Sequence, residues 1–132
     1  MTAQTLKMEV TEGKVKNIAL WVIQIGLAGM FFMAGGSKLA GVEKMVQVYN
    51  MIGIGQWFRI VTGLIEVGSA VMLLIPVLSG LGGLLLSATM IGAIITHLFV
   101  LGGSPALPIV LLIGSLIVAF GRKDRLFSLL GR

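Results

Sequence analysis

The chain has 132 residues, of which 57% are hydrophobic and 11% are charged, and its formal net charge is +5. A soluble domain carries about 25% charged residues, so this composition, with a mean hydropathy of +1.05, excludes an ordinary soluble protein and predicts an integral membrane protein. The chain contains no cysteine, which excludes disulfide exchange, thiol redox catalysis and iron–sulfur ligation by its own residues.

Several continuously apolar stretches are long enough to be helices across a bilayer, which takes about 20 residues. We expect four spans, at Asn17–Leu39, Trp57–Pro76, Gly80–Gly102 and Pro105–Phe120. The last is short, about 24 Å at 1.5 Å per residue, and needs its flanking residues or a locally thin bilayer. These stretches do not alternate apolar and polar residues, which excludes a β-barrel. The predicted fold class is all-α, an integral membrane four-helix bundle with short interfacial helices.

The two ends of the chain are polar and basic. We expect residues 1–16 to form a cytoplasmic tail or a short interfacial helix, residues 17–121 a four-transmembrane-helix domain, and residues 122–132 a basic amphipathic tail attracted to anionic lipid. The stretch Ile18–Met33 is long for the apolar part of a signal peptide, and no clear cleavage motif follows it. We therefore expect an uncleaved first helix.

A short amphipathic helix is predicted between the first and second spans. Its apolar residues follow the i, i+3, i+4, i+7 spacing of one helix face, and they are Val42, Met45, Val46, Tyr49 and Ile52. Such a helix is expected to lie flat in the outer interface, with Tyr49 and Trp57 as interfacial anchors. Two glycines, Gly53 and Gly55, are expected to end it and to allow the turn into the second span.

The third span carries small residues four apart, a spacing that lets helices pack closely in lipid. These residues are Gly83 and Ser87, and then Ala88, Gly92 and Thr96. We favour packing within the chain, and a contact between chains of an oligomer stays open. Tight turns are predicted at "IPVLSG" and "LGGSPALP", on the inner and outer sides respectively.

The distribution of Lys and Arg predicts the topology. Of the ten Lys and Arg residues, seven lie in the two tails, and Lys38, Lys44 and Arg59 lie in the first connection. The positive-inside rule therefore places both termini in the cytoplasm of a multi-pass protein, and we expect the bacterial inner (plasma) membrane. The same rule accounts for the positive net charge, so no nucleic-acid partner is predicted.

Four ionisable residues are predicted to lie in the outer half of the bundle. Arg59 and Glu66 share a helix face because they are two turns apart, and Glu66 is about 13 Å below the outer surface. Lys38 ends the first helix on the outer side, and His97 lies about 6 Å inside the same surface. These side chains come from three helices, so we expect them to close around one region.

Charges within a membrane are costly unless they are paired or face a cavity. In a structural interpretation, Lys38 and Arg59 extend to the headgroups, and Glu66 is a neutral acid or an ion pair. In a functional one, a carboxylate, a histidine and an arginine in an apolar cavity would suit a quinone, whose carbonyls need donors and whose reduction needs protons. A single histidine is a weak signal for a metal, so no metal site is predicted, and no catalytic residue is assigned.

Three segments resemble the DoxX-like family of small four-helix membrane proteins over about Ala19 to Phe120. They are "AGGSKL" at the end of the first helix, "GLIEVGSAVMLLIP" in the second and "ATMIGAIITHL" in the third. The resemblance places the family's recurrent polar positions on Lys38, Glu66 and His97. It implies a link to membrane-bound oxidoreductases, because the family's namesake is similar to a small membrane subunit of a thiosulfate:quinone oxidoreductase. Other members are similar to assembly chaperones of membrane receptors.

The sequence thus predicts an accessory subunit of a membrane redox system that binds quinone, or a similar apolar ligand, near Glu66 and His97. Because the chain has no redox centre or catalytic motif of its own, we interpret it as not being a complete enzyme. A non-enzymatic membrane scaffold or assembly chaperone is the alternative, and a small-solute or proton pathway ranks last because four short helices leave little room for a pore. The expected partners are the lipid bilayer and a membrane redox subunit.

Overall fold

The computed structural model describes residues 2–131, and that part of the chain is helical and has no strand. This confirms the predicted all-α class. The helices are α1 (Ala3–Ala40), α2 (Glu43–Ile52), α3 (Trp57–Leu74), α4 (Ser79–Thr96), α5 (Ala106–Gly121) and α6 (Lys123–Leu129), with a short 3₁₀ turn η1 (Pro76–Leu78) and a π turn η2 (His97–Leu101).

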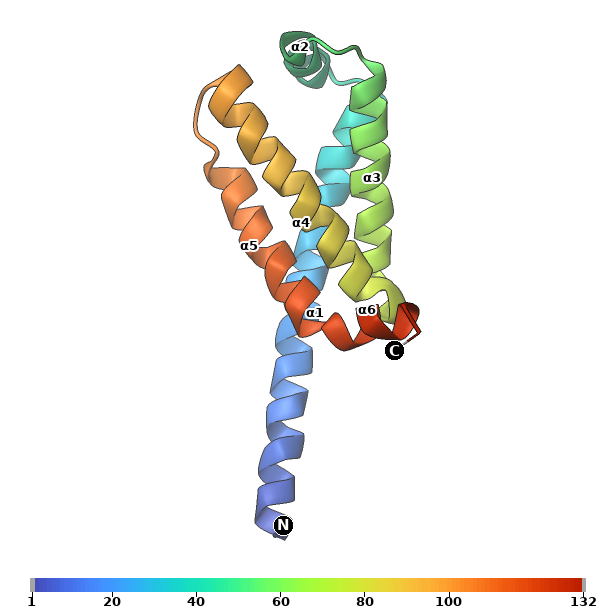
Figure 1. Ribbon diagram of the computed structural model, residues 1–132, viewed down its shortest axis with the longest axis vertical. Helices are drawn as coiled ribbons and strands as arrows, with labels where there is room; N and C mark the ends of the chain where they lie inside the picture. The colour runs from blue at the N-terminus through green and yellow to red at the C-terminus, as the bar shows by residue number, and fades with distance from the viewer. Residues whose placement is uncertain (1, 132) are drawn as a thin grey trace.

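The bundle is built from two helix pairs. Helix α1 packs mainly against α3, α4 packs mainly against α5, and the contact between α3 and α4 joins the pairs. Figure 1 shows the pairs meeting near α6 and diverging toward α2, so we call these the α6 end and the α2 end of the bundle. The buried core lies between the pairs and includes Phe31, Leu73, Leu86 and Val118.

The outward surface of the bundle is apolar, as expected of helices that face lipid. Val22, Leu64, Leu84 and Ile113 are examples of large hydrophobic residues that stay exposed. Among the described residues, three helical stretches are long and apolar enough to cross a membrane: Ala3–Ala40, Trp57–Leu74 and Pro76–Leu101. Ala106–Gly121 and Lys123–Leu129 are together long and apolar enough for a fourth span, although the chain bends by 63° between them. The predicted fourth span is therefore the short one, as its sequence indicates.

Helix α1 is longer than the predicted first span. It begins at Ala3, where the Thr2 side chain accepts a hydrogen bond from the Thr5 backbone N–H, and it continues without a break into the bundle. The expected separate tail or short interfacial helix at its start is thus part of α1. The reason is local, since no proline precedes Pro76 and a lone Gly13 does not end a helix. The proposed domain boundary after residue 16 stays a prediction.

Glycines set the closest helix contacts. A Cβ on Gly35 would lie 2.9 Å from the Gly63 carbonyl oxygen, so α1 and α3 touch there backbone to backbone. A Cβ on Gly83 would lie 2.8 Å from the Ala119 nitrogen, which confirms the predicted close packing at this residue, between α4 and α5. Gly92 would meet no atom within 4 Å, so it contributes no such contact within the chain.

The predicted amphipathic helix is confirmed as α2, which ends at Gly53 with a φ of 84°. The role expected for Tyr49 is wrong. Its side chain is buried, and its ring centroid lies 5.8 Å from that of Phe58, so it anchors α2 to α3 and not to the bilayer interface. Trp57 stays exposed, as an interfacial anchor requires.

Candidate functional site

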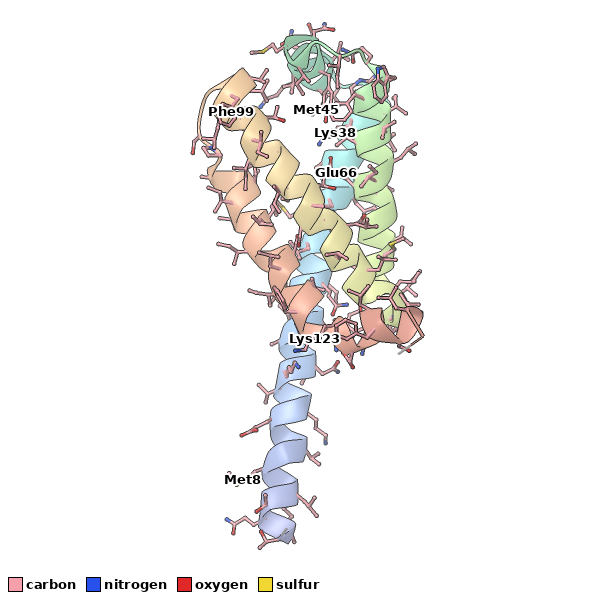
Figure 2. All side chains as sticks on the ribbon, viewed as in Figure 1. Met8, Lys38, Met45, Glu66, Phe99 and Lys123 are labelled. Carbon is pink, nitrogen blue, oxygen red and sulfur yellow. The ribbon has the colours of Figure 1, made fainter. Side chains whose placement is uncertain are left out.

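The main polar feature at the α2 end is an ion pair between α1 and α3. The Lys38 Nζ lies 2.7 Å from the Glu66 Oε1, and 2% of the Glu66 side chain is exposed against 15% of the Lys38 side chain. Figure 2 shows the two side chains near each other in the upper part of the bundle. Lys38 therefore turns inward to the carboxylate and does not extend to the headgroups.

The sequence positions this pair through the glycines beside it. Lys38 follows Gly35 by about one turn of α1, and Glu66 follows Gly63 by about one turn of α3. Because Gly35 lies against Gly63 and against the Cβ of Glu66, the two backbones are close enough for the long Lys38 side chain to reach back along α1 to the carboxylate. Removing two charges from water costs several kcal/mol for each ion, and the mutual attraction offsets that cost only while both partners are present.

Arg59 binds the end of α1 and not the Glu66 carboxylate. Its Nη1 donates to the Lys38 carbonyl oxygen, and its Nε donates to the Gln56 Oε1 at 2.8 Å. The last carbonyls of a helix lack the usual partner four residues on and carry the negative end of the helix dipole, and the Lys38 carbonyl also accepts from the Gly41 backbone N–H. Arg59 therefore caps α1 and holds the backbone of the residue that pairs with Glu66.

His97 makes its contacts within its own helix end and not with the other predicted site residues. It begins η2 and is half-buried, and its Nδ1 lies 3.4 Å from the Gly102 carbonyl oxygen. Within residues 2–131, no hydrogen bond or ion pair joins it to Lys38, Arg59 or Glu66. The predicted group of four thus divides into a connected set of three and a histidine within its own helix end. No group of three His, Asp or Glu side chains that could hold a metal ion is found in that part of the chain.

Comparison with known families identifies the chain. A family model described as the DoxX-like family matches residues 22–120. The chain belongs to the DoxX-like family. This match covers the bundle, including the ion pair, and confirms the resemblance carried by the three sequence segments.

Among curated proteins, this DoxX-like chain is similar to a Bacillus subtilis (strain 168) protein named "Putative oxidoreductase CatD". The two are 34% identical over 67 residues, which are 51% of this chain and 50% of the relative. The match thus spans about half the length of that relative. No solved structure matches the chain.

A second polar site of the DoxX-like bundle lies at the α6 end. The Gln24 Nε2 donates to the Leu73 carbonyl oxygen at 2.7 Å, and the Gln24 Oε1 accepts from the Arg122 Nε at 2.8 Å. Gln24 is fully buried, and 5% of Arg122 is exposed. One amide therefore ties α1 to the end of α3 and to the joint between α5 and α6.

This second site was not predicted, because the sequence pattern places Arg122 in a basic amphipathic tail. The guanidinium instead lies over the Trp21 ring, 5.8 Å from its centroid. The neighbouring Arg125 Nη1 donates to the Pro76 carbonyl oxygen at 3.0 Å and to the Ser79 Oγ at 3.2 Å, which fastens α6 to the turn between α3 and α4. The available signal was Gln24, a single amide within an otherwise apolar stretch.

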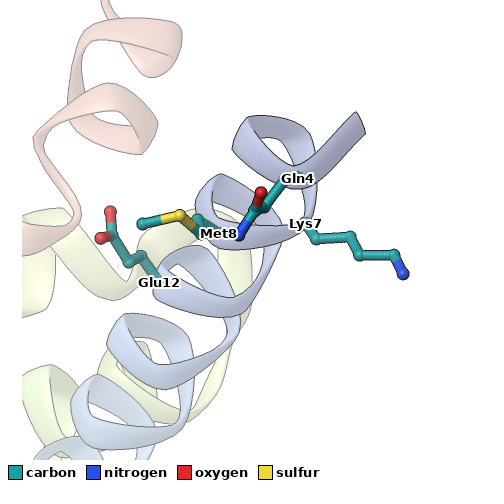
Figure 3. Close-up of a pocket in the computed structure, with 4 residues that line it drawn as sticks. All are labelled: Gln4, Lys7, Met8 and Glu12. Carbon is teal, nitrogen blue, oxygen red and sulfur yellow. The ribbon is translucent and has the colours of Figure 1, made fainter. Parts of the chain in front are cut away.

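Two surface depressions lie away from both polar sites. A groove of about 480 Å³ runs between α3 and α4 and is mainly apolar. Its lining is Leu64, Ile65, Gly68, Ser69, Met72, Leu85, Ala88 and Thr89. A shallow depression near the N-terminus is formed by one face of α1 alone, as Figure 3 shows, and its residues are Gln4, Lys7, Met8 and Glu12.

Proposed function

We propose that this DoxX-like protein is an accessory subunit of a membrane redox system and binds a quinone, or a similar apolar carrier with carbonyl groups, at the Lys38–Glu66 pair. The observation that carries the proposal is this buried ion pair, at 2.7 Å, within helices apolar enough to span a membrane. Apolar residues of similar volume often give an equal or better stability than a buried ion pair. A role in binding is therefore a reason for the two charges to be there.

The chemistry of the pair fits a quinone. The ammonium of Lys38 can donate to a carbonyl oxygen, and the carboxylate of Glu66 can accept a proton and, once protonated, deliver it to the reduced quinone. Arg59 holds the backbone of Lys38 and would act as a positioning residue, while His97 would approach the ligand only if the α2 end rearranges. The redox link is supported by the family and by the printed name of the Bacillus subtilis relative.

The topology proposed with this function has both termini in the cytoplasm of a bacterial inner membrane. It is supported by the basic residues at the α6 end and in the tails. The α2 end would then face the outer side, where the ion pair would meet a carrier that moves within the bilayer. A membrane redox subunit would supply the electrons, because this chain contains no cysteine for an iron–sulfur centre.

The test uses the purified full-length protein and decylubiquinone as the probe. Saturable stabilisation of the wild type against thermal unfolding is expected, and Glu66→Gln should lose this response. The matched control is Glu43→Gln, the same change at an exposed position of α2, which should keep it. Absence of any saturable response in the wild type to decylubiquinone or a menaquinone would contradict the proposal.

A second candidate function is a scaffold or assembly factor, and one observation favours it. The ion pair lies beside the close contact of Gly35 and Gly63, where it could serve only to clamp α1 to α3. In that case Glu66→Gln would reduce the amount of folded protein, and a partner protein would co-purify with the wild type and with the residual folded variant alike. Loss of the quinone response without loss of folding would favour the first function.

A further inference from the structure

The joint between α5 and α6 carries more positive charge than the protein around it neutralises. Arg122, Lys123 and Arg125 follow one another closely, and Asp124 is the acidic residue among them. Within the described residues, no Asp or Glu oxygen lies within 4.0 Å of the nitrogens of these three side chains. The positive charge at this joint is therefore not neutralised by described residues nearby in the sequence or by those that the fold brings close.

Arg122 carries a positive charge that lies mostly within the protein. Its side chain is buried, its Nε binds the neutral amide of Gln24, and its Nη2 is covered and has no hydrogen-bond partner. A buried charge is costly unless it is paired. The Trp21 ring face offers partial compensation, and no formal negative charge is in contact with the guanidinium.

The other two basic residues reach the surface of the same joint. Lys123 is exposed at the start of α6, where Figure 2 labels it, and Arg125 is half-exposed. On the same short helix and just after it, Phe127 and Leu130 are exposed apolar residues. The joint bends the chain by 63° at the end of an apolar helix, which is where a membrane-spanning segment reaches the headgroup region.

We propose that the α5–α6 joint binds the phosphate group of an anionic phospholipid. Lys123 contacts the phosphate together with Arg125, which uses guanidinium nitrogens other than the Nη1 that binds Pro76 and Ser79. The buried Arg122 attracts the phosphate through its charge without touching it. Phe127 and Leu130 lie among the acyl chains. Charge complementarity favours an anion, and the exposed apolar residues beside the basic ones favour a lipid over a soluble phosphate. This site lies at the opposite end of the bundle from the proposed quinone site, so either proposal can fail without the other.

The experiment titrates the delipidated full-length protein in neutral detergent with phosphatidylglycerol, phosphatidylcholine or inorganic phosphate, and follows thermal unfolding. Phosphatidylglycerol should raise Tm in a saturable way, and the other two should not. Lys123→Gln and Arg125→Gln should each weaken the apparent affinity for phosphatidylglycerol about fivefold, the effect of one basic residue at an anionic surface. The matched control, Lys44→Gln, removes one exposed charge at the α2 end and should leave the affinity unchanged.

Arg125→Gln also removes the hydrogen bonds to Pro76 and Ser79, so its response is expressed relative to its own Tm without lipid. Arg122 is tested separately because it is buried and its replacement breaks the hydrogen bond to Gln24. Gln24→Leu breaks the same bond and keeps the charge, so it should lower Tm in every condition and retain the response to phosphatidylglycerol. Arg122→Gln should lower Tm and weaken the response. Wild-type affinity in both Lys123→Gln and Arg125→Gln would overturn the proposal. An equal response to phosphatidylcholine would also overturn it, as would a response to inorganic phosphate that matches the lipid.

Discussion

The two ends of the bundle bury charge in different ways. At the α2 end, Lys38 and Glu66 neutralise each other at 2.7 Å, so the buried unit has no net charge. At the α6 end, Arg122 is held by the neutral amide of Gln24 and stays positive. A pair without net charge is less costly to bury among apolar helices than a single charge. A net positive charge is stabilised in the headgroup region, where anions are available. Burial alone therefore does not define a site, because the way in which the charge is compensated decides what the site can bind.

The largest expected effect comes from breaking the ion pair on one side. Lys38→Met leaves the Glu66 carboxylate buried without a cation and should lower the free energy of unfolding by about 3–5 kcal/mol. Denaturation in detergent measures it, with the exposed Lys44→Met as the control. The double variant Lys38→Met/Glu66→Met should regain most of the loss. If the double variant is no more stable than Lys38→Met, the two charges are not coupled.

The next effect tests the α6 end. Gln24→Leu removes the acceptor of the Arg122 Nε and the donor to the Leu73 carbonyl oxygen, and each group left unpaired should cost about 1–3 kcal/mol. The same unfolding measurement applies. Gln47→Leu changes an exposed glutamine on α2 and should have little effect. A Gln24→Leu protein as stable as the wild type would mean that the amide does not hold the three segments together.

The glycine contact beside the ion pair should be sensitive to one methyl group. In Gly63→Ala the added Cβ would lie 3.0 Å from Leu39 carbons and 3.1 Å from the Gly35 carbonyl oxygen. Separating α1 from α3 should cost about 1–3 kcal/mol, the usual range for overpacking. Gly92→Ala is the matched control, because its Cβ would meet nothing within 4 Å, and its Tm should not fall. Equal stability of the two variants would show that the close contact has no energetic weight.

The smallest effect is expected for the cap on α1. Arg59→Gln removes one of two donors to the Lys38 carbonyl oxygen, the other being the Gly41 backbone N–H, and should cost about 0.3–1 kcal/mol, the usual contribution of a cation at a helix C-terminus. A loss as large as that of Lys38→Met would mean that Arg59 also stabilises the Glu66 carboxylate. The comparison of these two variants thus separates capping from charge pairing.

Hydropathy predicted most of the fold. The apolar stretches predicted the helices of the bundle, the i, i+3, i+4 spacing predicted α2, and Gly53 marked its end, because these features depend on local sequence. The start of α1 was predicted less well. The polar residues at the start of the chain predict a tail, whereas in the structure Thr2 caps a helix that nothing interrupts before the bundle. Polarity tells whether a segment enters lipid, and it does not tell whether the segment is helical.

The position of each site residue along its helix was predictable from the sequence, but the partner of each side chain was not. Depth placed Lys38, Arg59, Glu66 and His97 in the outer half of the bundle, and it could not tell which cation would reach the carboxylate. That depends on the rotation of α1 against α3, which Gly35 and Gly63 permit. The contact between Gln24 and Arg122 joins residues 98 positions apart, and such a pairing follows only from the tertiary fold.

The uninterrupted α1 has a mechanical consequence. Its first turns leave the bundle, as Figure 1 shows, and their described side chains are exposed up to Ala19. The 17 helical residues from Ala3 to Ala19, at about 1.5 Å each, give a rod of about 25 Å. Gln24 and the Gly35–Gly63 contact hold the same helix further along. A force applied to the exposed start of α1 would therefore be transmitted along the rigid helix into the bundle. A molecule that binds the exposed first turns of α1 would thereby exert force on the backbone of Lys38.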